Sequence, residues 1–236
     1  MKRMKGVMQK SIALLLVLVM LSSVISPVMA ANAEACSACD NKKDLKIQEI
    51  DGAEKYKLLA DAVNTEEFKK LSKGVDLSPS MLLKNAKVFK FMNSAGEQAL
   101  FAVLPIGYEK DKDVKLSSVV IPLTGNSKPV KYSITISGKK IGAVEFYSLD
   151  KEGNVKLVAV AEDGRVSILS DDYWTCVIEC LIQDCLPGVG GICAVCLSPP
   201  AGPCYLAVRY PSYYTAAACA ICLGISLAGC LWECTW

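Results

Sequence analysis

The placement of its cysteines is the feature that most constrains the fold of this 236-residue chain. Ten of the 12 cysteines lie in the last 66 residues, from Asp171 to Trp236. This tail also holds all three tryptophans, but no lysine, methionine or phenylalanine. So short a segment buries too little apolar surface to outweigh its chain entropy, and disulfide bonds restrict the unfolded chain instead. We therefore expect residues 171–236 to form a separate, disulfide-bonded domain.

The spacing of these cysteines predicts helices. Two pairs are four residues apart and two are CxxC pairs, so each pair would lie on one face of a helix and could bond to a facing helix. The best helix candidates are residues 215–232 and 174–183, and segments rich in Pro and Gly separate them. We expect three or four short helices and up to five bridges, whose pairing stays open. The disulfide candidates are Cys176, Cys180, Cys185, Cys193, Cys196, Cys204, Cys219, Cys222, Cys230 and Cys234.

The tail also contains an internal repeat. The pattern CxxC, seven residues and a further cysteine begins at Cys193 and recurs 26 residues later, at Cys219. A repeated pattern of this kind predicts two related helical units that stack on each other.

Residues 1–30 are typical of a secretory signal peptide. A basic start that ends at Lys10 is followed by an apolar run over residues 12–25 and by small residues that favour cleavage after Ala30. An uncleaved membrane anchor and a lipoprotein at Cys36 are the alternatives; the run is short for the first, and Glu34 disfavours the second. Export implies an oxidising environment, which favours disulfides. We expect a secreted protein, with association with the cell envelope left open.

The middle of the chain predicts an α+β domain with an antiparallel sheet. Residues 31–53 are expected to be a linker with a local bridge between Cys36 and Cys39, and residues 42–51 within it a linker or first strand. Residues 54–170 form the domain itself: residues 54–73 suit one or two helices, the second capped at Thr65. Alternating segments and polar turns then predict strands. These strands are expected at residues 88–92, 99–104, 115–123, 130–137, 142–148, 155–161 and 166–169.

Several function classes are disfavoured by composition. The chain has no histidine, which removes the Ser–His and Cys–His catalytic arrangements and the commonest metal ligand. Catalytic spacings and phosphate-binding loops are also missing from the sequence, so we expect no enzyme, no cofactor and no metal. The net charge is +2 over residues 31–170 and −4 over the tail, which argues against a nucleic-acid partner.

Three interpretations of the tail compete. Zinc binding by the two CxxC pairs is disfavoured by the 22 residues between them and by the oxidising environment. A transmembrane anchor over residues 215–232 is disfavoured by its three cysteines and by the lack of basic flanking residues. A released, membrane-active peptide is favoured, because the apolar content exceeds what so small a core can hold. Trp174, Trp232 and Trp236 would then suit a membrane interface.

With ten cysteines in an apolar C-terminal segment behind a leader and a mid-sized domain, the chain resembles precursors of the halocin C-eight type of cysteine-rich bacteriocin. The resemblance implies cleavage near Ser170, Asp171 and Asp172, which would release an antimicrobial peptide of about 65 residues. It implies that the middle domain binds this peptide and gives immunity or masking, and that the peptide acts on a target-cell membrane or on a receptor in it. A folding aid or cell-surface module without affinity for the peptide is the alternative for this domain. The twin-arginine leader of the archaeal form is missing here, which points to the general secretion route. An uncleaved surface protein with a docking tail remains the alternative.

The acidic tail bears on the mechanism that the resemblance implies. A charge of −4 removes the electrostatic attraction to anionic lipid, which is worth about 1 kcal/mol per basic residue. Targeting would therefore depend on hydrophobic insertion or on a receptor.

Overall fold

The computed structural model describes residues 45–75, 79–138, 140–162, 165–185 and 192–235, all of which belong to one compact unit. The expected signal peptide with its cleavage after Ala30, the Cys36–Cys39 bridge and Trp236 lie outside the described residues. Those three expectations stay predictions.

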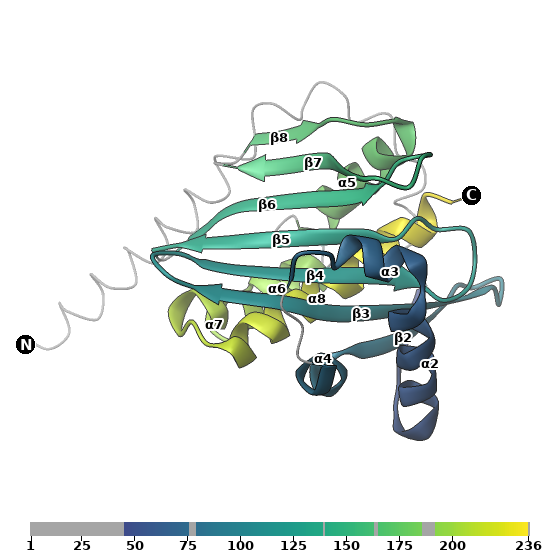
Figure 1. The fold of residues 1–236 in the computed structure, drawn as a ribbon. Helices are drawn as coiled ribbons and strands as arrows, with labels where there is room; N and C mark the ends of the chain where they lie inside the picture. Colours follow the sequence, from purple (N-terminus) through teal and green to yellow (C-terminus); the bar gives the residue numbers. More distant parts are fainter. Residues whose placement is uncertain (1–44, 76–78, 139, 163–164, 186–191, 236) are drawn as a thin grey trace, which may run out of the picture. The chain divides into compact units, whose positions relative to one another are not determined.

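An eight-stranded antiparallel sheet forms the middle layer of the molecule (Figure 1). Its strands follow one another in sequence order from one edge of the sheet to the other, so each strand pairs with its neighbours in the chain. The predicted antiparallel sheet is confirmed, and β1 lies at the end of the segment that was expected to be a linker or first strand. The strands are β1 (Lys46–Ile50), β2 (Lys87–Met92), β3 (Gln98–Lys110), β4 (Val114–Pro122), β5 (Val130–Ser137), β6 (Lys140–Leu149), β7 (Val155–Glu162) and β8 (Arg165–Ile168).

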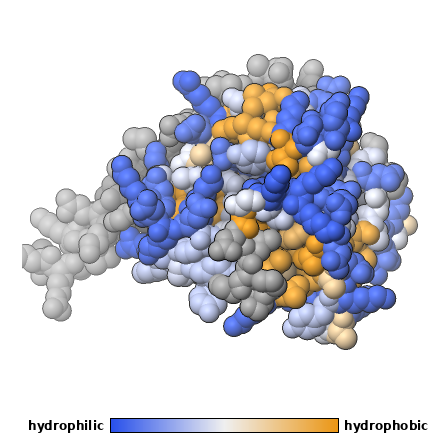
Figure 2. Space-filling model, in the orientation of Figure 1, coloured by the Kyte–Doolittle hydropathy of each residue, from blue (hydrophilic) through white to orange (hydrophobic). Residues whose placement is uncertain are grey.

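Three helices pack on one face of the sheet: α2 (Gly52–Asn64), α3 (Glu66–Leu71) and α4 (Pro79–Asn85). The Thr65 hydroxyl accepts a hydrogen bond from the backbone N–H of Phe68 at 3.2 Å and so caps α3 as expected. The short helix α4 was not predicted, because seven residues carry too little periodicity to reveal it. Figure 2 views the molecule from this side and shows hydrophilic residues over much of it, with hydrophobic areas between them.

Four helices from the tail cover the opposite face of the sheet (Figure 1). They are α5 (Asp172–Cys185), α6 (Ile192–Leu197), α7 (Pro203–Arg209) and α8 (Tyr213–Glu233). The long helix α8 begins at a capping box, in which Ser212 and Thr215 satisfy each other's backbone N–H groups. The helical, disulfide-bonded tail that the cysteine spacing predicts is therefore confirmed.

The tail and the sheet share one hydrophobic core. Along β3, Phe101 and Val103 contribute to the cluster that contains α5 and α8, whereas Ala102 and Leu104 contribute to the cluster beneath α2–α4. Both faces of the central strands are therefore buried, and the core continues across the expected domain boundary at Asp171. The apolar surface that the tail cannot bury within itself is buried against the sheet. Whether residues 171–236 also fold alone stays a prediction.

The 26-residue repeat takes two different forms. The first copy is divided between α6 and α7, because Pro199, Pro200 and Pro203 interrupt the helix, and the second copy lies within the uninterrupted α8. The two copies are bonded to each other through Cys196–Cys222 and Cys204–Cys219. They are therefore linked as expected, but as two short helices against one long helix.

Candidate functional site between the sheet and the disulfide-bonded helices

Five disulfide bonds hold the tail together: Cys176–Cys234, Cys180–Cys230, Cys185–Cys193, Cys196–Cys222 and Cys204–Cys219. Cys176 and Cys180 of α5 bond to Cys234 and Cys230 at the end of α8, as their four-residue spacing predicts. The CxxC pairs behave differently, since Cys193 bonds within the α5–α6 segment while Cys196 bonds to α8. All five bridges lie between residues 176 and 234. None of them joins the tail to the sheet, so the main chain is the covalent link between the two.

The pairing bears on the zinc interpretation. The four cysteines of the two CxxC pairs are all bonded to other cysteines, so their thiolates are not free to bind a metal. Within the described residues, no three potential metal-ligating side chains come together. The structure gives zinc binding by these pairs no support.

The middle of α8 lies very close to the sheet at Gly224. A Cβ atom at this position would lie 2.5 Å from Val103 Cγ1 and 2.9 Å from the Tyr132 hydroxyl. The Tyr132 hydroxyl donates a hydrogen bond to the carbonyl oxygen of Ala220, one turn earlier in α8. The helix can approach this closely only because residue 224 has no side chain. Gly224 and Tyr132 therefore define where α8 sits on the sheet.

Polar and aromatic contacts hold both ends of α8. At its start, the Tyr213 hydroxyl accepts a hydrogen bond from Asn85 Nδ2 at 3.2 Å, and the ring centroids of Tyr213 and Tyr108 are 5.7 Å apart. At its end, the carbonyl oxygen of Leu231 accepts hydrogen bonds from the hydroxyls of Ser127 at 3.3 Å and Tyr173 at 3.4 Å. These contacts satisfy a carbonyl near the helix end that has no partner within the helix.

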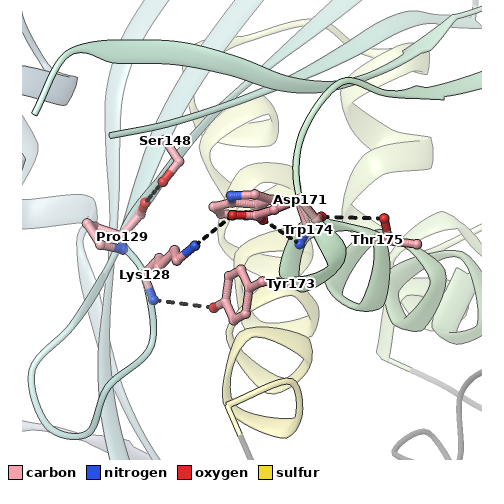
Figure 3. A network of polar contacts seen from close by, with 7 residues as sticks. All are labelled: Lys128, Pro129, Ser148, Asp171, Tyr173, Trp174 and Thr175. Atoms are coloured by element: carbon pink, nitrogen blue, oxygen red, sulfur yellow. Dashed lines mark hydrogen bonds and ion pairs between the residues drawn. The ribbon is translucent and has the colours of Figure 1, made fainter. Parts of the chain in front are cut away.

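The chain crosses from sheet to tail at residues 169–172, within a polar network that Figure 3 shows. Asp171 immediately precedes α5 and caps it: its side chain accepts a hydrogen bond from the backbone N–H of Trp174 at 3.4 Å. The same carboxylate forms an ion pair with Lys128 Nζ at 3.3 Å. The Lys128 ammonium also lies 4.7 Å from the centroid of the Tyr173 ring. Of the three residues expected at the cleavage point, Asp171 and Asp172 are exposed and Ser170 is half-buried. The junction is accessible, but it is held by contacts on both sides.

Trp174 and Trp232 do not lie at the surface. Trp174 is 2% exposed and Trp232 is 5% exposed, and the ring of Trp232 contacts Phe91 of β2 with centroids 6.4 Å apart. Membrane contact through these two side chains would require α5 and α8 to leave the sheet.

Asp184 is a buried polar residue that sequence reasoning did not single out. Its carboxylate is 4% exposed and accepts hydrogen bonds from the backbone N–H of Cys193 at 3.0 Å and from the Ser226 hydroxyl. It thereby links the end of α5 to α6 and α8. The available signal was an acidic residue beside a cysteine in an otherwise apolar segment. Acidic residues are buried only when they are paired, so burial of such a residue would indicate hydrogen-bond partners in neighbouring segments.

The buried tyrosines predict how stability depends on pH. Burial raises the pKa of Tyr132 well above its usual range and that of Tyr173 to about 12. In the unfolded chain both would ionise near pH 10, so stability is fully present below pH 10 and falls as pH rises above it. Each tyrosine is expected to contribute a slope of up to ~1.4 kcal/mol per pH unit.

Replacing Tyr132 with phenylalanine tests this dependence. The free energy of unfolding of Tyr132→Phe is expected to be ~1 kcal/mol lower at pH 8, because the hydrogen bond to Ala220 is lost. Between pH 10 and 11.5 it is expected to fall less steeply than that of the wild type. Urea unfolding at each pH measures both, with Tyr56→Phe as an exposed control. Parallel curves for wild type and Tyr132→Phe would contradict the assignment.

Helix α8 also bears on the anchor interpretation. By length and composition, it is the one helix of the described residues that could cross a membrane, with a mean hydropathy of 1.9. However, 67% of that window is buried inside the molecule, and the buried core helix of a soluble protein meets the same criterion. The hydropathy alone therefore does not make α8 an anchor.

Searches of protein-family models, curated proteins and solved structures gave no match to this chain.

Proposed function

We propose that this chain is a secreted bacteriocin precursor, whose sheet domain covers the membrane-active face of its disulfide-bonded C-terminal peptide until the junction at residues 170–172 is cut. The observation that carries the proposal is the burial of α8, a helix of membrane-spanning length and hydropathy, against the sheet. Five disulfides are consistent with an oxidising, extracellular type of environment. The resemblance to halocin C-eight precursors supports the same order of peptide and masking domain.

The bridge pattern supports release by a single cut. Because each of the five disulfides in the described residues joins two residues of the tail, cleavage before α5 would leave residues 171–236 as one cross-linked peptide. The exposed residues Leu169, Asp171 and Asp172 would give a protease access to the chain. The tail itself contains one basic residue, Arg209, so an enzyme that cuts after Lys or Arg would find almost nothing to cut within it.

A precursor with a specific protease site inserted between Ser170 and Asp171 tests the proposal. The intact, oxidised protein is expected to cause little leakage from lipid vesicles and no inhibition of related bacteria. After the cut, the two pieces are expected to stay associated in buffer, because the interface resembles a protein core, and to separate in urea. The tail recovered from urea is expected to cause leakage or inhibition, and adding the sheet domain back is expected to suppress it. A recovered tail that is inactive on membranes and on every related strain would exclude the proposed function.

The continuous core also favours a second candidate, an uncleaved protein of the cell envelope. A domain that shares its core with the rest of the chain is stable without processing. Mass spectrometry of the culture medium distinguishes the two candidates. A species of about 7 kDa, ten hydrogens lighter than the reduced chain, supports the bacteriocin, and intact cell-bound protein supports the envelope candidate.

A further inference from the structure

Tyrosines gather at the end of the tail where α7 meets the start of α8. Tyr210 is 64% exposed and Tyr214 is 69% exposed. The Tyr214 ring contacts the ring of Tyr213 at 5.9 Å, and Tyr213 in turn contacts Tyr108 of β3 at 5.7 Å. We call Tyr210, Tyr213, Tyr214 and the neighbouring Arg209 the tyrosine surface. It is exposed while the tail is still docked on the sheet.

Charge is distributed unevenly over the tail. From Ile192 to Gly229 there is no acidic residue, and Arg209 is the single basic one. The acidic residues outside the core are Asp171 and Asp172 at the start of α5, Glu179 within α5, and Glu233 at the end of α8. The bridge Cys180–Cys230 places this part of α5 beside the end of α8, at the other end of the tail. A helix of 21 residues spans roughly 30 Å, so the tyrosine surface is far from Glu233. The net charge of −4 therefore does not describe this end of the molecule.

Apolar side chains are also exposed on the neighbouring helix α6. Val195 is 58% exposed and Leu197 is 37% exposed, and α6 packs against α7. Tyrosine has an apolar ring and a polar hydroxyl, which suits it to the boundary between lipid headgroups and acyl chains. Exposed tyrosines and aliphatic residues, with one cation and no carboxylate from this part of the tail, therefore match the chemistry of a lipid surface.

We propose that the tyrosine surface is the part of this protein that first contacts an anionic lipid membrane. The inference rests on the membrane step of the proposed function and adds a place and a direction to it. The membrane is approached by the end of the tail at which α8 begins, rather than by the buried Trp174 and Trp232. Because no carboxylate lies between residues 192 and 229, the tail itself adds no repulsion of anionic headgroups at this end. Around the neighbouring β3–β4 turn, next to Tyr108, the exposed acidic residues Glu109, Asp111 and Asp113 alternate with Lys110 and Lys112.

The test uses the intact, oxidised chain and sedimentation with vesicles of phosphatidylglycerol and phosphatidylcholine. The wild type is expected to bind, and the variant Tyr210→Ser/Tyr214→Ser is expected to bind about tenfold more weakly, because two exposed aromatic rings no longer enter the interface. Tyr56 is a matched control, since it is 60% exposed but lies on α2, across the sheet. Tyr56→Ser is expected to bind like the wild type. Equal binding by the wild type and the double variant would overturn the proposal.

Two further measurements identify the ligand. Arg209→Gln is expected to weaken binding about fivefold on anionic vesicles and to leave binding to neutral vesicles unchanged, as expected for one basic residue at a charged surface. Purified cell-wall glycan serves as the competing ligand, because tyrosine rings also stack on sugars; binding to glycan but not to vesicles would overturn the proposal. Vesicle binding by the intact chain does not require release of the tail. A failure here is therefore distinct from a failure of the proposed function, which the activity of the separated tail decides.

Discussion

Replacing Cys180 and Cys230 together with alanine is expected to lower the free energy of unfolding by about 4 kcal/mol. This bridge joins α5 to α8. Because Cys176–Cys234 links the same segments four residues further out on each side, loss of Cys180–Cys230 opens a loop of only about eight residues, which accounts for ~2.5 kcal/mol of the expected loss. Both side chains are buried, at 1% and 0% exposure, and truncating them also removes packing between the two helices.

The bridge between Cys185 and Cys193 provides the matched control. It closes a loop of only eight residues, and its removal is expected to cost about 2.5 kcal/mol by the same relation. Guanidinium unfolding of the intact, oxidised proteins measures both values, and the fluorescence of the buried Trp174 and Trp232 reports on the region concerned. The two bridges are matched in loop length, so an equal loss for the two variants, or a larger loss for the Cys185–Cys193 variant, would contradict the contribution from packing between α5 and α8.

The secondary structure could largely be predicted from the sequence. The alternation of apolar and polar residues, with polar turns between the segments, indicates the strands. Each strand pairs with its neighbours in the chain, so the turns that connect them are short and their residues can be recognised in the sequence. Gly96 and Gly153, for example, have positive φ values of 84° and 77° at turns that the sequence predicts. The helices of the tail follow from cysteines spaced three or four residues apart. The bridge pairing could not be predicted, because five bridges allow about 945 connectivities.

The docking of the tail on the sheet could not be predicted from local patterns. The apolar excess of the tail indicates that it needs a partner, but does not say that the partner is its own chain. One signal was available: residues 99–106 of β3 form an almost continuous apolar run, which is typical of a strand that is covered on both faces. The contacts of Gly224 with Val103 and of Lys128 with Asp171 depend on how distant segments are aligned, and no local pattern records that alignment.

Replacing Gly224 with valine is expected to destabilise the intact protein by about 3 kcal/mol. Alanine or valine would form helix more readily than glycine, by up to ~1 kcal/mol, so helix propensity predicts the opposite sign. The loss arises because even a Cβ at this position would lie 2.5 Å from Val103 Cγ1, and Val103 is fully buried in the sheet and cannot move aside. Urea unfolding of the oxidised chain measures the loss. Ala218→Val, at an exposed position of the same helix, accounts for the cost of a β-branched residue in a helix.

A double-mutant cycle locates this effect in the contact between α8 and the sheet. Val103→Ala removes the two methyl groups nearest to residue 224, so the double variant Gly224→Val/Val103→Ala is expected to lose less stability than the sum of the two single variants. Additive losses would mean that the cost of valine at position 224 does not arise from its contact with Val103. With the contact located in this way, the same substitution becomes a test of masking. In the chain cut at the junction, Gly224→Val is expected to release the tail at a lower urea concentration than the wild type, since the bridges that hold the four helices together are unchanged.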